Sequence, residues 1–399
     1  MRVSVVIVSR HRPALLRRCL LGLTQQDLPG FEVVVVADPA GIAMAEGFAV
    51  KRLAFDEPNI SAARNLGLVQ AAGDVVAFID DDAVPEPTWL SRLTAPFADG
   101  QVIAATGFIR GRNGISFQWR AAWVDAEGHD LPMAVDSVTL LSSTRAKAVK
   151  TQGTNCAFRR ETLAGAGGFD PAFQFFHDET DLNLRLAGHG LTAIVPDAQV
   201  HHGFAEGPHR RADRVPKSLH EIAASTAVFL RRHAGGATDQ HLADLTARER
   251  RRTLGHMVAG RIEPRDVTHL TAGLRAGWAD GLSRALTDLP PLPPPQAAFL
   301  PLHGPGPRQG LVLSGWRHQA PALEAQARAA VAQGRIVTLL LFSRDARPHW
   351  HGFGMDGVWR QTGGLFGPAD RGEAPFRLWR MTQRRDHEIT RLCRLRATE

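Results

Sequence analysis

The chain has 399 residues, of which 44% are hydrophobic and 22% are charged. This balance excludes a disordered chain, and at roughly 150 residues per domain the length predicts two or three globular domains. Basic residues exceed acidic ones by 47 to 40, a net charge of +7 that is small for this length and is carried almost wholly by Arg. Because the Arg clusters lie in separate segments without aromatic stacking motifs, we expect no nucleic-acid partner.

The cysteine pattern and the hydropathy indicate the compartment. Cys19, Cys156 and Cys393 lie far apart and in no metal-ligand spacing, which argues against a disulfide framework and for a reducing environment. The apolar run at residues 1–8 is too short for the core of a signal peptide, and no stretch approaches the ~18 apolar residues of a membrane span. We therefore expect a cytoplasmic protein.

Buried strands and amphipathic helices alternate in the first part of the chain. Val3–Val8 is typical of a strand buried on both faces, and apolar residues at helical spacing over Leu15–Leu23 predict a helix. Further strands are expected over Phe31–Ala37 and Val75–Ile79, with a helix over Ser61–Ala72 between them. This alternation predicts an α/β fold with a mostly parallel sheet and helices on both faces.

The elements that follow are less regular in sequence. Pro85–Phe97 is expected to be a helix because a proline near its start suits the first turn, whereas residues 110–150 show no clear pattern. Leu191–Val195 predicts a strand that ends in a turn at Pro196 and Asp197. The other expected elements are strands over Val102–Thr106 and Thr154–Phe158 and helices over Arg160–Ala166 and Glu179–Ala187.

Composition divides the chain into four parts, the first being a domain over residues 1–205. Residues 206–289 are rich in Arg, Ala and Leu at helical spacing and predict a helical appendage, and residues 290–308 contain a proline cluster typical of a semi-rigid linker. Residues 309–399 predict a small α/β unit. Its expected elements are a strand at Leu311–Leu313, a helix at Ala320–Ala332, a strand at Ile336–Phe342 and an amphipathic segment at Phe376–Leu395.

Three consecutive acids, Asp80, Asp81 and Asp82, directly follow a predicted buried strand. Adjacent carboxylates repel one another, so this position is unfavourable unless a cation compensates. Mg²⁺ and Mn²⁺ use few carboxylates together with substrate phosphates, which suits such a cluster. A solvated acidic turn or a cap for the next helix is the alternative interpretation. Ser9 and Asp38 also fall at the carboxyl ends of strands, where parallel sheets bind their ligands.

A second acidic group lies in the first turn of an expected helix. Asp181 and Arg185 are four residues apart, so for these two a structural ion pair along the helix is the favoured interpretation. Asp178 and Glu179 are different, because one carboxylate is enough to complement the helix dipole. The other is available as a general base beside a substrate.

Two further polar motifs depend on what surrounds them. Arg64 and Asn65 lie in the first turn of a predicted helix, where ordinary surface polarity is the alternative to a binding role. His201 and His202 follow a predicted strand, and such a pair is more often a packing or surface feature than a ligand.

Taken in order over about residues 1–203, these motifs resemble family 2 glycosyltransferases of the GT-A fold. Each motif alone is weak evidence, but the chance that all of them occur in the family's order by coincidence is small. The first half of the resemblance is carried by Val5 to Arg10, Asp38, Ser61 to Gly67, Ala72 to Asp74, Phe78 to Asp82 and Trp89-Leu90. The second half is carried by Gly153 to Arg160, Gly167 to Asp170 and Asp178 to Leu186.

The resemblance implies a nucleotide-diphosphate sugar as the donor. By position, Ser9 and Asp38 would hold the base and the ribose, and Arg64 would approach the diphosphate. Arg10 and Asp81 are expected in the same nucleotide-sugar site.

The resemblance also implies Mn²⁺ or Mg²⁺ as cofactor. Asp80 and Asp82 take the places of the family's DxD pair, with Asp82 the expected metal ligand and Asp80 at the metal and nearer the ribose. His202, or else His201, falls where many such enzymes place a further metal or phosphate contact.

The acid pair departs from the family's usual order. In the family's Glu-Asp pair the second acid is the catalytic base, so Glu179 holds the base position here and Asp178 is the alternative. No Gln-x-x-Arg-Trp stretch follows, and that signature accompanies processive synthases. The resemblance therefore implies an inverting, non-processive transferase.

We accordingly expect a metal-dependent glycosyltransferase of surface polysaccharide or glycoconjugate synthesis, acting on a carbohydrate or lipid-linked acceptor. A nucleotidyltransferase-like or non-catalytic nucleotide-sugar-binding protein is the alternative. The Phe376–Leu395 segment is expected to pack on its own unit, or else to rest on the inner face of a membrane. The basic residues 209–217 are expected to be a mobile lid or a solvated loop. Because the chain has no tyrosine, sugar stacking is expected from Trp89, Trp119 or Trp123.

Overall fold

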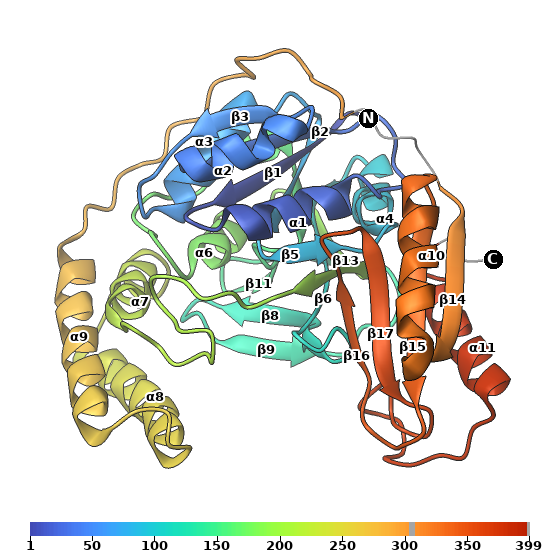
Figure 1. The fold of residues 1–399 in the computed structure, drawn as a ribbon. Helices are drawn as coiled ribbons and strands as arrows, with labels where there is room; N and C mark the ends of the chain where they lie inside the picture. The colour runs from blue at the N-terminus through green and yellow to red at the C-terminus, as the bar shows by residue number, and fades with distance from the viewer. Residues whose placement is uncertain (303–307, 397–399) are drawn as a thin grey trace.

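The computed structural model describes residues 1–302 and 308–396, so part of the predicted linker and the last three residues of the predicted C-terminal unit lie outside the described residues. The main feature is a ten-stranded sheet in the order β10-β13-β6-β12-β4-β1-β2-β3, with β5 paired to β13 and β7 paired to β6 (Figure 1). Its strands are β1 (Val3–Ser9), β2 (Glu32–Ala37), β3 (Lys51–Ala54), β4 (Val75–Asp80), β5 (Ala83–Pro85), β6 (Val102–Arg110), β7 (Phe117–Trp119), β10 (Thr139–Ser142), β12 (Cys156–Arg159) and β13 (Leu191–His202).

The direction of the strands confirms the expected mostly parallel sheet. β1, β2, β3, β4, β6 and β13 share one direction, while β12, β10, β5 and β7 run against them. In the register of β1 with its neighbours, Ser9 pairs with Ala37 and Val8 pairs with Asp80. The carboxyl ends of the central strands therefore meet at one edge, where the acids follow β4.

Helices cover both faces of this sheet, as the alternating pattern predicted. One face packs against α1 (Pro13–Leu23), α2 (Pro39–Met44) and α4 (Trp89–Thr94), and the other against α3 (Ile60–Gln70), α5 (Arg160–Gly165) and α6 (Asp178–Arg185). Alternate residues of β2 point to opposite faces of the sheet. Val35 packs in the core on the first face, and Val34 packs in the core on the second. Short 3-10 helices lie at Ala45–Gly47, Ala95–Ala98 and Arg317–Gln319.

Two sequence-based assignments near the acids are wrong. The helix expected from Pro85 begins only at Trp89, because Ala83–Pro85 pairs with β13 as β5. The turn expected at Pro196 and Asp197 is a bulge inside the continuous strand β13, whose register with β6 shifts between Val195 and Val200. Pairing with β6 and β5 supplies hydrogen bonds that the local sequence does not reveal. The same strand consequently carries His201 and His202 alongside β5.

Residues 110–150, which showed no clear pattern, add a small second sheet. Its strands are β8 (Ala121–Asp125), β9 (Asp130–Met133) and β11 (Lys147–Val149), in the order β11-β8-β9. These strands are short and only partly buried, so their alternation is weak.

The helical part of the second half is confirmed, although residues 206–219 contain no helix. Its helices are α7 (His220–His233), α8 (Asp239–Val258) and α9 (Pro264–Ser283), which we call the helical appendage and which share a core around Leu230 and Trp278. None of the described helices has both the length and the apolar character needed to cross a membrane.

The C-terminal unit, β14 to α11, forms its own sheet in the order β14-β15-β17-β16 (Figure 1). The expected strand, helix, strand succession is confirmed, and α11 packs through Leu392 on the same unit. The elements are β14 (Gly310–Trp316), α10 (Ala320–Ala332), β15 (Ile336–Ser343), β16 (Trp350–Phe353), β17 (Val358–Gly364) and α11 (Met381–Leu392).

The described part of the proline-rich segment is held against the central sheet by hydrogen bonds. Buried Glu32 accepts from the Ser4 hydroxyl at 2.6 Å and from the backbone N–H of Leu300 at 3.0 Å, and it pairs with Lys51 at 2.8 Å. The same carboxylate accepts from the backbone N–H of Ala72. Glu32 therefore joins β1, β2, β3 and the proline-rich segment.

Replacing Glu32 by Ala is expected to lower the free energy of unfolding by about 3 kcal/mol, because the mostly buried Lys51 loses its charge partner and several buried donors lose their acceptor. Urea unfolding followed by tryptophan fluorescence measures this. Glu57→Ala, at an exposed position, is the control and should change the value by less than about 0.5 kcal/mol. Equal effects of the two substitutions would contradict this anchoring role.

Candidate functional site

The three acids after β4 point in different directions. Asp81 is fully buried, where it accepts from the Ser9 hydroxyl at 2.7 Å and pairs with Arg12 at 2.6 Å. Burial raises the pKa of Asp81 to about 7, although Arg12 opposes the shift. Asp81 and Ser9 thus face the interior behind the strand ends, and the structure leaves Asp80 and Asp82 to face the other way.

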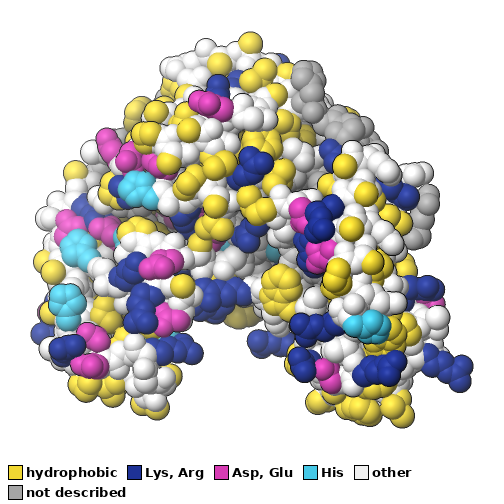
Figure 2. Space-filling view, in the orientation of Figure 1, with side chains coloured by type: hydrophobic (Ala, Val, Ile, Leu, Met, Phe, Trp, Pro, Cys, Tyr) yellow, Lys and Arg dark blue, Asp and Glu magenta, His cyan; other side chains and the backbone are white. Residues whose placement is uncertain are grey.

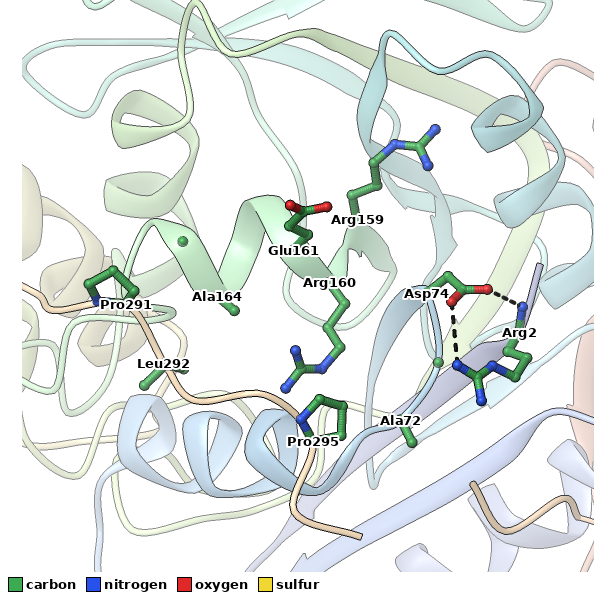
Figure 3. A pocket seen from close by; sticks show the side chains of 12 residues that line it. Arg2, Ala72, Asp74, Arg159, Arg160, Glu161, Ala164, Pro291, Leu292 and Pro295 are labelled. Carbon is green, nitrogen blue, oxygen red and sulfur yellow. Dashed lines mark hydrogen bonds and ion pairs between the residues drawn. The ribbon is translucent and has the colours of Figure 1, made fainter. Parts of the chain in front are cut away.

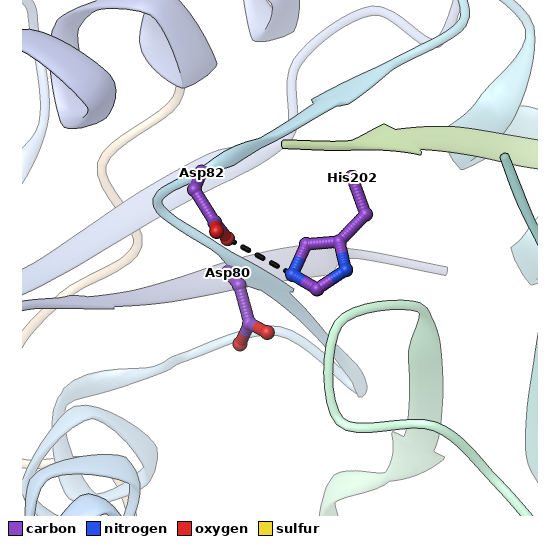
Figure 4. A group of neighbouring side chains, drawn as sticks. All are labelled: Asp80, Asp82 and His202. Atoms are coloured by element: carbon purple, nitrogen blue, oxygen red, sulfur yellow. Dashed lines mark ion pairs between the residues drawn. The ribbon is translucent and has the colours of Figure 1, made fainter. Parts of the chain in front are cut away.

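Asp80, Asp82 and His202 come together on the opposite side (Figure 4). One donor atom from each lies within 4.8 Å of the others, and His202 Nε2 is 3.2 Å from Asp82 Oδ1. Burial opposes ionisation of Asp82, but His202, Arg12 and the backbone N–H of Ala205 hold its pKa well below the usual range. A group that stays charged at this depth suits a cation site.

Pairing between β5 and β13 brings Asp82 and His202 together. Ala83 lies opposite His202 in the register, and the backbone N–H of Gly203 donates to the Asp82 carbonyl at 2.9 Å. His201 points to the other side of the strand, where its Nε2 lies 2.7 Å from Glu86. Of the two histidines, the structure therefore places His202 with the acids.

The donor set fits a hard divalent cation. Two carboxylates and an imidazole are ligands that Mn²⁺ and Mg²⁺ accept, and the Asp80 side chain is 32% exposed, which leaves room for phosphate or water. His202 Nδ1 lies 3.0 Å from the Gln118 side-chain oxygen, a contact that orients the ring so that Nε2 faces Asp82.

Arg64 links this cluster to the second acidic group. Its guanidinium is buried and pairs with Asp80 at 3.4 Å and, more closely, with Asp178. Burial alone would lower the pKa of Arg64, and the carboxylates of Asp178 and Asp80 outweigh it and raise the pKa. Gly153 lies directly beside this guanidinium, and a Cβ there would force the guanidinium to shift. Arg64 is therefore held between the two expected halves of the site, and its expected contact with a diphosphate stays a prediction.

Asp178 and Glu179 begin α6 and differ in their surroundings. Asp178 is held by Arg64, whereas burial and the neighbouring Asp178 carboxylate raise the pKa of Glu179. The two residues before them, Phe176 and His177, have φ values of 74° and 65°, a backbone conformation that is costly for bulky residues. The surrounding structure must therefore hold this segment in place.

The helical appendage supplies that support. The buried ring of His177 stacks on Phe229 of α7 at 4.8 Å between centroids, and Ser225 of the same helix donates to the Phe175 carbonyl at 2.7 Å. Asp181 accepts from Arg185 at 2.7 Å, which confirms the expected ion pair, and also lies 2.9 Å from His233 of α7. Sequence reasoning missed His177, because only the long-range contact with α7 reveals its position.

Arg10 and Asp38 make their polar contacts with residues other than Asp80, Asp82 and His202. Arg10 donates to Asp56 at 2.8 Å, and His11 approaches the same carboxylate at 2.8 Å. Asp38 caps α2 by accepting from the backbone N–H of Ala40 and also accepts from that of His11 at 2.8 Å. These contacts position the loop after β1 over the end of β2. Asp56 was not expected from the sequence, because nothing nearby in the chain marks it.

The basic loop after β13 contacts Asp82 and the segment that precedes the Asp178–Glu179 pair. Arg210 lies 4.0 Å from Asp82, and His209 stacks on Phe175 at 4.2 Å between ring centroids. Arg112, from the connection between β6 and β7, donates to the carbonyls of Gly203 at 3.1 Å and Phe204 at 2.6 Å. The expectation of a lid stays a prediction. Arg210 belongs to the basic stretch 209–217 singled out in sequence, whereas Arg12, which pairs with Asp81, was not expected in the site.

Of the tryptophans expected to stack on sugar, Trp89 is excluded by its position. It is fully buried in the core, and its indole N–H donates to Asn155 at 2.8 Å. Trp119 and Trp123 are half-buried, with the ammonium groups of Lys150 and Lys147 at 5.3 Å and 4.7 Å from their ring centroids. A sugar-stacking role for these two stays a prediction.

A cavity of about 520 Å³ lies at the opposite edge of the sheet, beside the start of β1 and β4 (Figure 3). Its arginines already have partners, since Arg2 pairs with Asp74 at 3.7 Å and Arg160 donates to the Ala71 carbonyl at 2.8 Å. The residues described along its wall include no site residue expected from the sequence. We therefore do not assign this cavity to the functional site.

Comparison with known proteins finds a family match in the N-terminal part of the chain. Residues 4–164 match the family described as "Glycosyl transferase family 2". The O-antigen biosynthesis protein RfbC of Myxococcus xanthus is 31% identical over 247 residues, which cover 54% of this chain and 18% of that protein. The chain thus spans less than a fifth of the length of that relative.

Solved structures with a similar arrangement include two with bound nucleotide compounds. A crystal structure of GalNAc-T7 with UDP, GalNAc and Mn²⁺ is 16% identical, covering 58% of this chain and 48% of that one, with a TM-score of 0.43. Residues 1–349 of TarS from S. aureus, in complex with UDP-GlcNAc, are 17% identical, covering 71% of this chain and 80% of that one, with a TM-score of 0.45. The finding that bears on identity is therefore the family match: residues 4–164, the N-terminal part of this chain, match glycosyl transferase family 2.

Proposed function

We propose that the protein is an inverting, metal-dependent, non-processive glycosyltransferase. It transfers a sugar from a nucleotide-diphosphate sugar to a hydroxyl of a carbohydrate or lipid-linked acceptor. The observation that carries the proposal is the Arg64 pairing, which places a cation-ready cluster around Asp80 next to an acid pair whose second member, Glu179, has a raised pKa. The match to RfbC, an O-antigen biosynthesis protein, supports a role in polysaccharide synthesis.

The donor half would be formed by the strand ends around β1 and β4. Asp82, Asp80 and His202 would hold Mn²⁺ or Mg²⁺, which when bound neutralises the charge of a diphosphate. Arg12 and Arg210 flank Asp82 at 4.0 Å each and add positive charge where a leaving diphosphate develops its charge. Figure 2 shows a hollow between the helical appendage and the C-terminal unit, with Lys and Arg side chains at its rim. A negatively charged donor suits such a rim.

The acceptor half would use Glu179 as the general base. Its raised pKa gives it affinity for a proton, whereas Asp178 is paired with Arg64. As the acceptor oxygen bonds to the anomeric carbon, its proton passes to Glu179 and the bond from that carbon to the diphosphate oxygen breaks. One displacement of this kind inverts the configuration at the anomeric carbon. Trp119 and Trp123, beside Lys150 and Lys147, would form the acceptor surface.

Incubating the protein with Mn²⁺ and a panel of nucleotide sugars is expected to release nucleoside diphosphate from at least one of them. Asp82→Ala is expected to reduce this release by roughly 10²-fold or more, because a metal supplies several kcal/mol of charge stabilisation. The control Asp136→Ala, at an exposed position, should keep the activity. If no donor is bound or turned over, and Asp82→Ala changes no binding, the transferase proposal fails.

Glu179→Gln is expected to keep donor binding while transfer falls about 10²- to 10⁴-fold, the usual contribution of a general base. Calorimetric titration with the donor and a transfer assay separate the two effects. Glu161→Gln makes the same change at an exposed residue of α5 and should leave both unaltered. Retained transfer in Glu179→Gln would move the base assignment to Asp178.

The base must be deprotonated to act, so a raised pKa of Glu179 means that kcat/KM rises with pH through that raised pKa and is lost below it. Asp178→Asn removes the neighbouring negative charge, which lowers the pKa of Glu179. The acidic limb of the kcat/KM profile is therefore expected to move to lower pH in this variant, whatever happens to the maximum rate. If the acidic limb stays in place or moves to higher pH, it reports the ionisation of a group other than Glu179.

A further inference from the structure

Arg396, at the end of the C-terminal unit, is fully buried against the glycosyl transferase family 2 domain. Its guanidinium makes two hydrogen bonds to Glu86, from Nε to Oε2 at 2.7 Å and from Nη2 to Oε1 at 2.8 Å. The remaining contacts come from the C-terminal unit itself. Nη1 donates to the Thr338 hydroxyl at 2.8 Å, His351 Nε2 lies at 3.0 Å, and the ring of Trp359 lies 4.0 Å below the guanidinium.

Glu86 joins the two strands that carry the metal-ligand candidates. It directly follows β5, its backbone N–H donates to the Gln199 carbonyl of β13 at 3.0 Å, and its side chain lies 2.7 Å from His201. Along this pair of strands His201 lies opposite Val84. Asp82 and His202 occupy the far end of the same short pairing. The position of Glu86 therefore determines how β5 and β13 approach each other at the ligands.

The C-terminal unit makes a second contact that leads to the same cluster. In β16, the backbone N–H of His351 donates to the Asn113 carbonyl at 2.7 Å, and the indole of Trp350 donates to the Arg112 carbonyl at 3.1 Å. Arg112 in turn binds the carbonyls of Gly203 and Phe204, which directly follow His202. The C-terminal unit is thus linked to the residues on both sides of His202 in the chain, to His201 through Glu86 and to Gly203 through Arg112.

The energetics of the Arg396 pair favour a positioning role over a purely stabilising one. Burying two charges costs several kcal/mol each, so a buried ion pair contributes little net stability compared with apolar packing. Its two parallel hydrogen bonds nevertheless fix orientation more strictly than apolar side chains do. Burial opposes ionisation of Glu86, but Arg396 and His201 lower its pKa to about 2, so the pair stays charged.

We propose that the C-terminal unit positions the cation site, and that Arg396 is its positioning residue, acting through Glu86 on the β5–β13 pairing that holds Asp82 and His202. This inference rests on the metal dependence in the proposed function. It gives the C-terminal unit a role that does not require contact with donor or acceptor. The unit acts by keeping Asp82 and His202 in register through the β5–β13 pairing.

The test measures Mn²⁺ binding without any sugar nucleotide, by electron paramagnetic resonance of free Mn²⁺, at a temperature well below the melting temperature of each variant. Arg396→Ala is expected to weaken Mn²⁺ binding about tenfold, the lower end of the range for residues that orient metal ligands. The matched control is Arg394→Ala, which truncates an exposed arginine two residues away. This variant should bind Mn²⁺ like the wild type.

Arg396→Lys keeps the charge opposite Glu86 but loses the second parallel hydrogen bond, so it should fold and show an intermediate loss of Mn²⁺ affinity. This variant decides the question if Arg396→Ala does not fold. Unchanged Mn²⁺ affinity in the folded Arg396 variants, with only a lowered melting temperature, would overturn the inference and leave the proposed function intact. Absence of Mn²⁺ binding in the wild type would instead overturn the metal dependence itself, and this inference with it.

Discussion

The arrangement of the site depends on one buried guanidinium, that of Arg64. A charge at this depth is stable only when carboxylates surround it, and Arg64 contacts one from each side, Asp80 after β4 and Asp178 at the start of α6. The interaction therefore imposes a distance between two segments that approach the sheet edge separately. The closeness of Gly153 to the guanidinium shows how little space the backbone leaves around it. Any movement of α6 away from the strand ends would leave a buried charge without its partner.

Two parts of the chain that support this arrangement lie outside residues 4–164, the range that matches glycosyl transferase family 2. His177 and Phe176 adopt a costly backbone conformation just before the acid pair, and α7 supports it through Phe229 and Ser225. On the other side, the C-terminal unit reaches the β5–β13 pairing through Arg396. The acid pair and the metal-ligand cluster are thus supported by different added parts of the chain, while the central sheet fixes only where the strands end.

The local sequence pattern predicted those parts of the fold whose structure is marked by residues close together in the chain. The buried run of β1, the helical spacing of α1 and the acids after β4 are visible within a few residues, so the sheet and its carboxyl edge could be predicted. β13 could not, because Pro196 and Asp197 look like a turn, and only pairing with β6 and β5 turns them into a bulge. Glu86 and Arg396 are 310 positions apart, so no local pattern relates them. The motifs predicted Asp80, Asp82 and His202, or else His201, as cation ligands, but the inward direction of Asp81 follows from its contacts with Ser9 and Arg12.

The Arg-rich composition acquires a physical meaning from these contacts. A net charge of +7 is small, yet several arginines are deeply buried, and each binds carboxylates or carbonyls in a fixed direction. A guanidinium presents donors in a planar fork, so Arg64 can bind two acids from different segments and Arg396 can bind one acid at two points. An ammonium group has no such directionality and would not specify the angle between the partners. The excess of Arg over Lys therefore provides directional links between segments, and only a few arginines, Arg12 and Arg210 among them, remain near Asp82 where a diphosphate would add its charge.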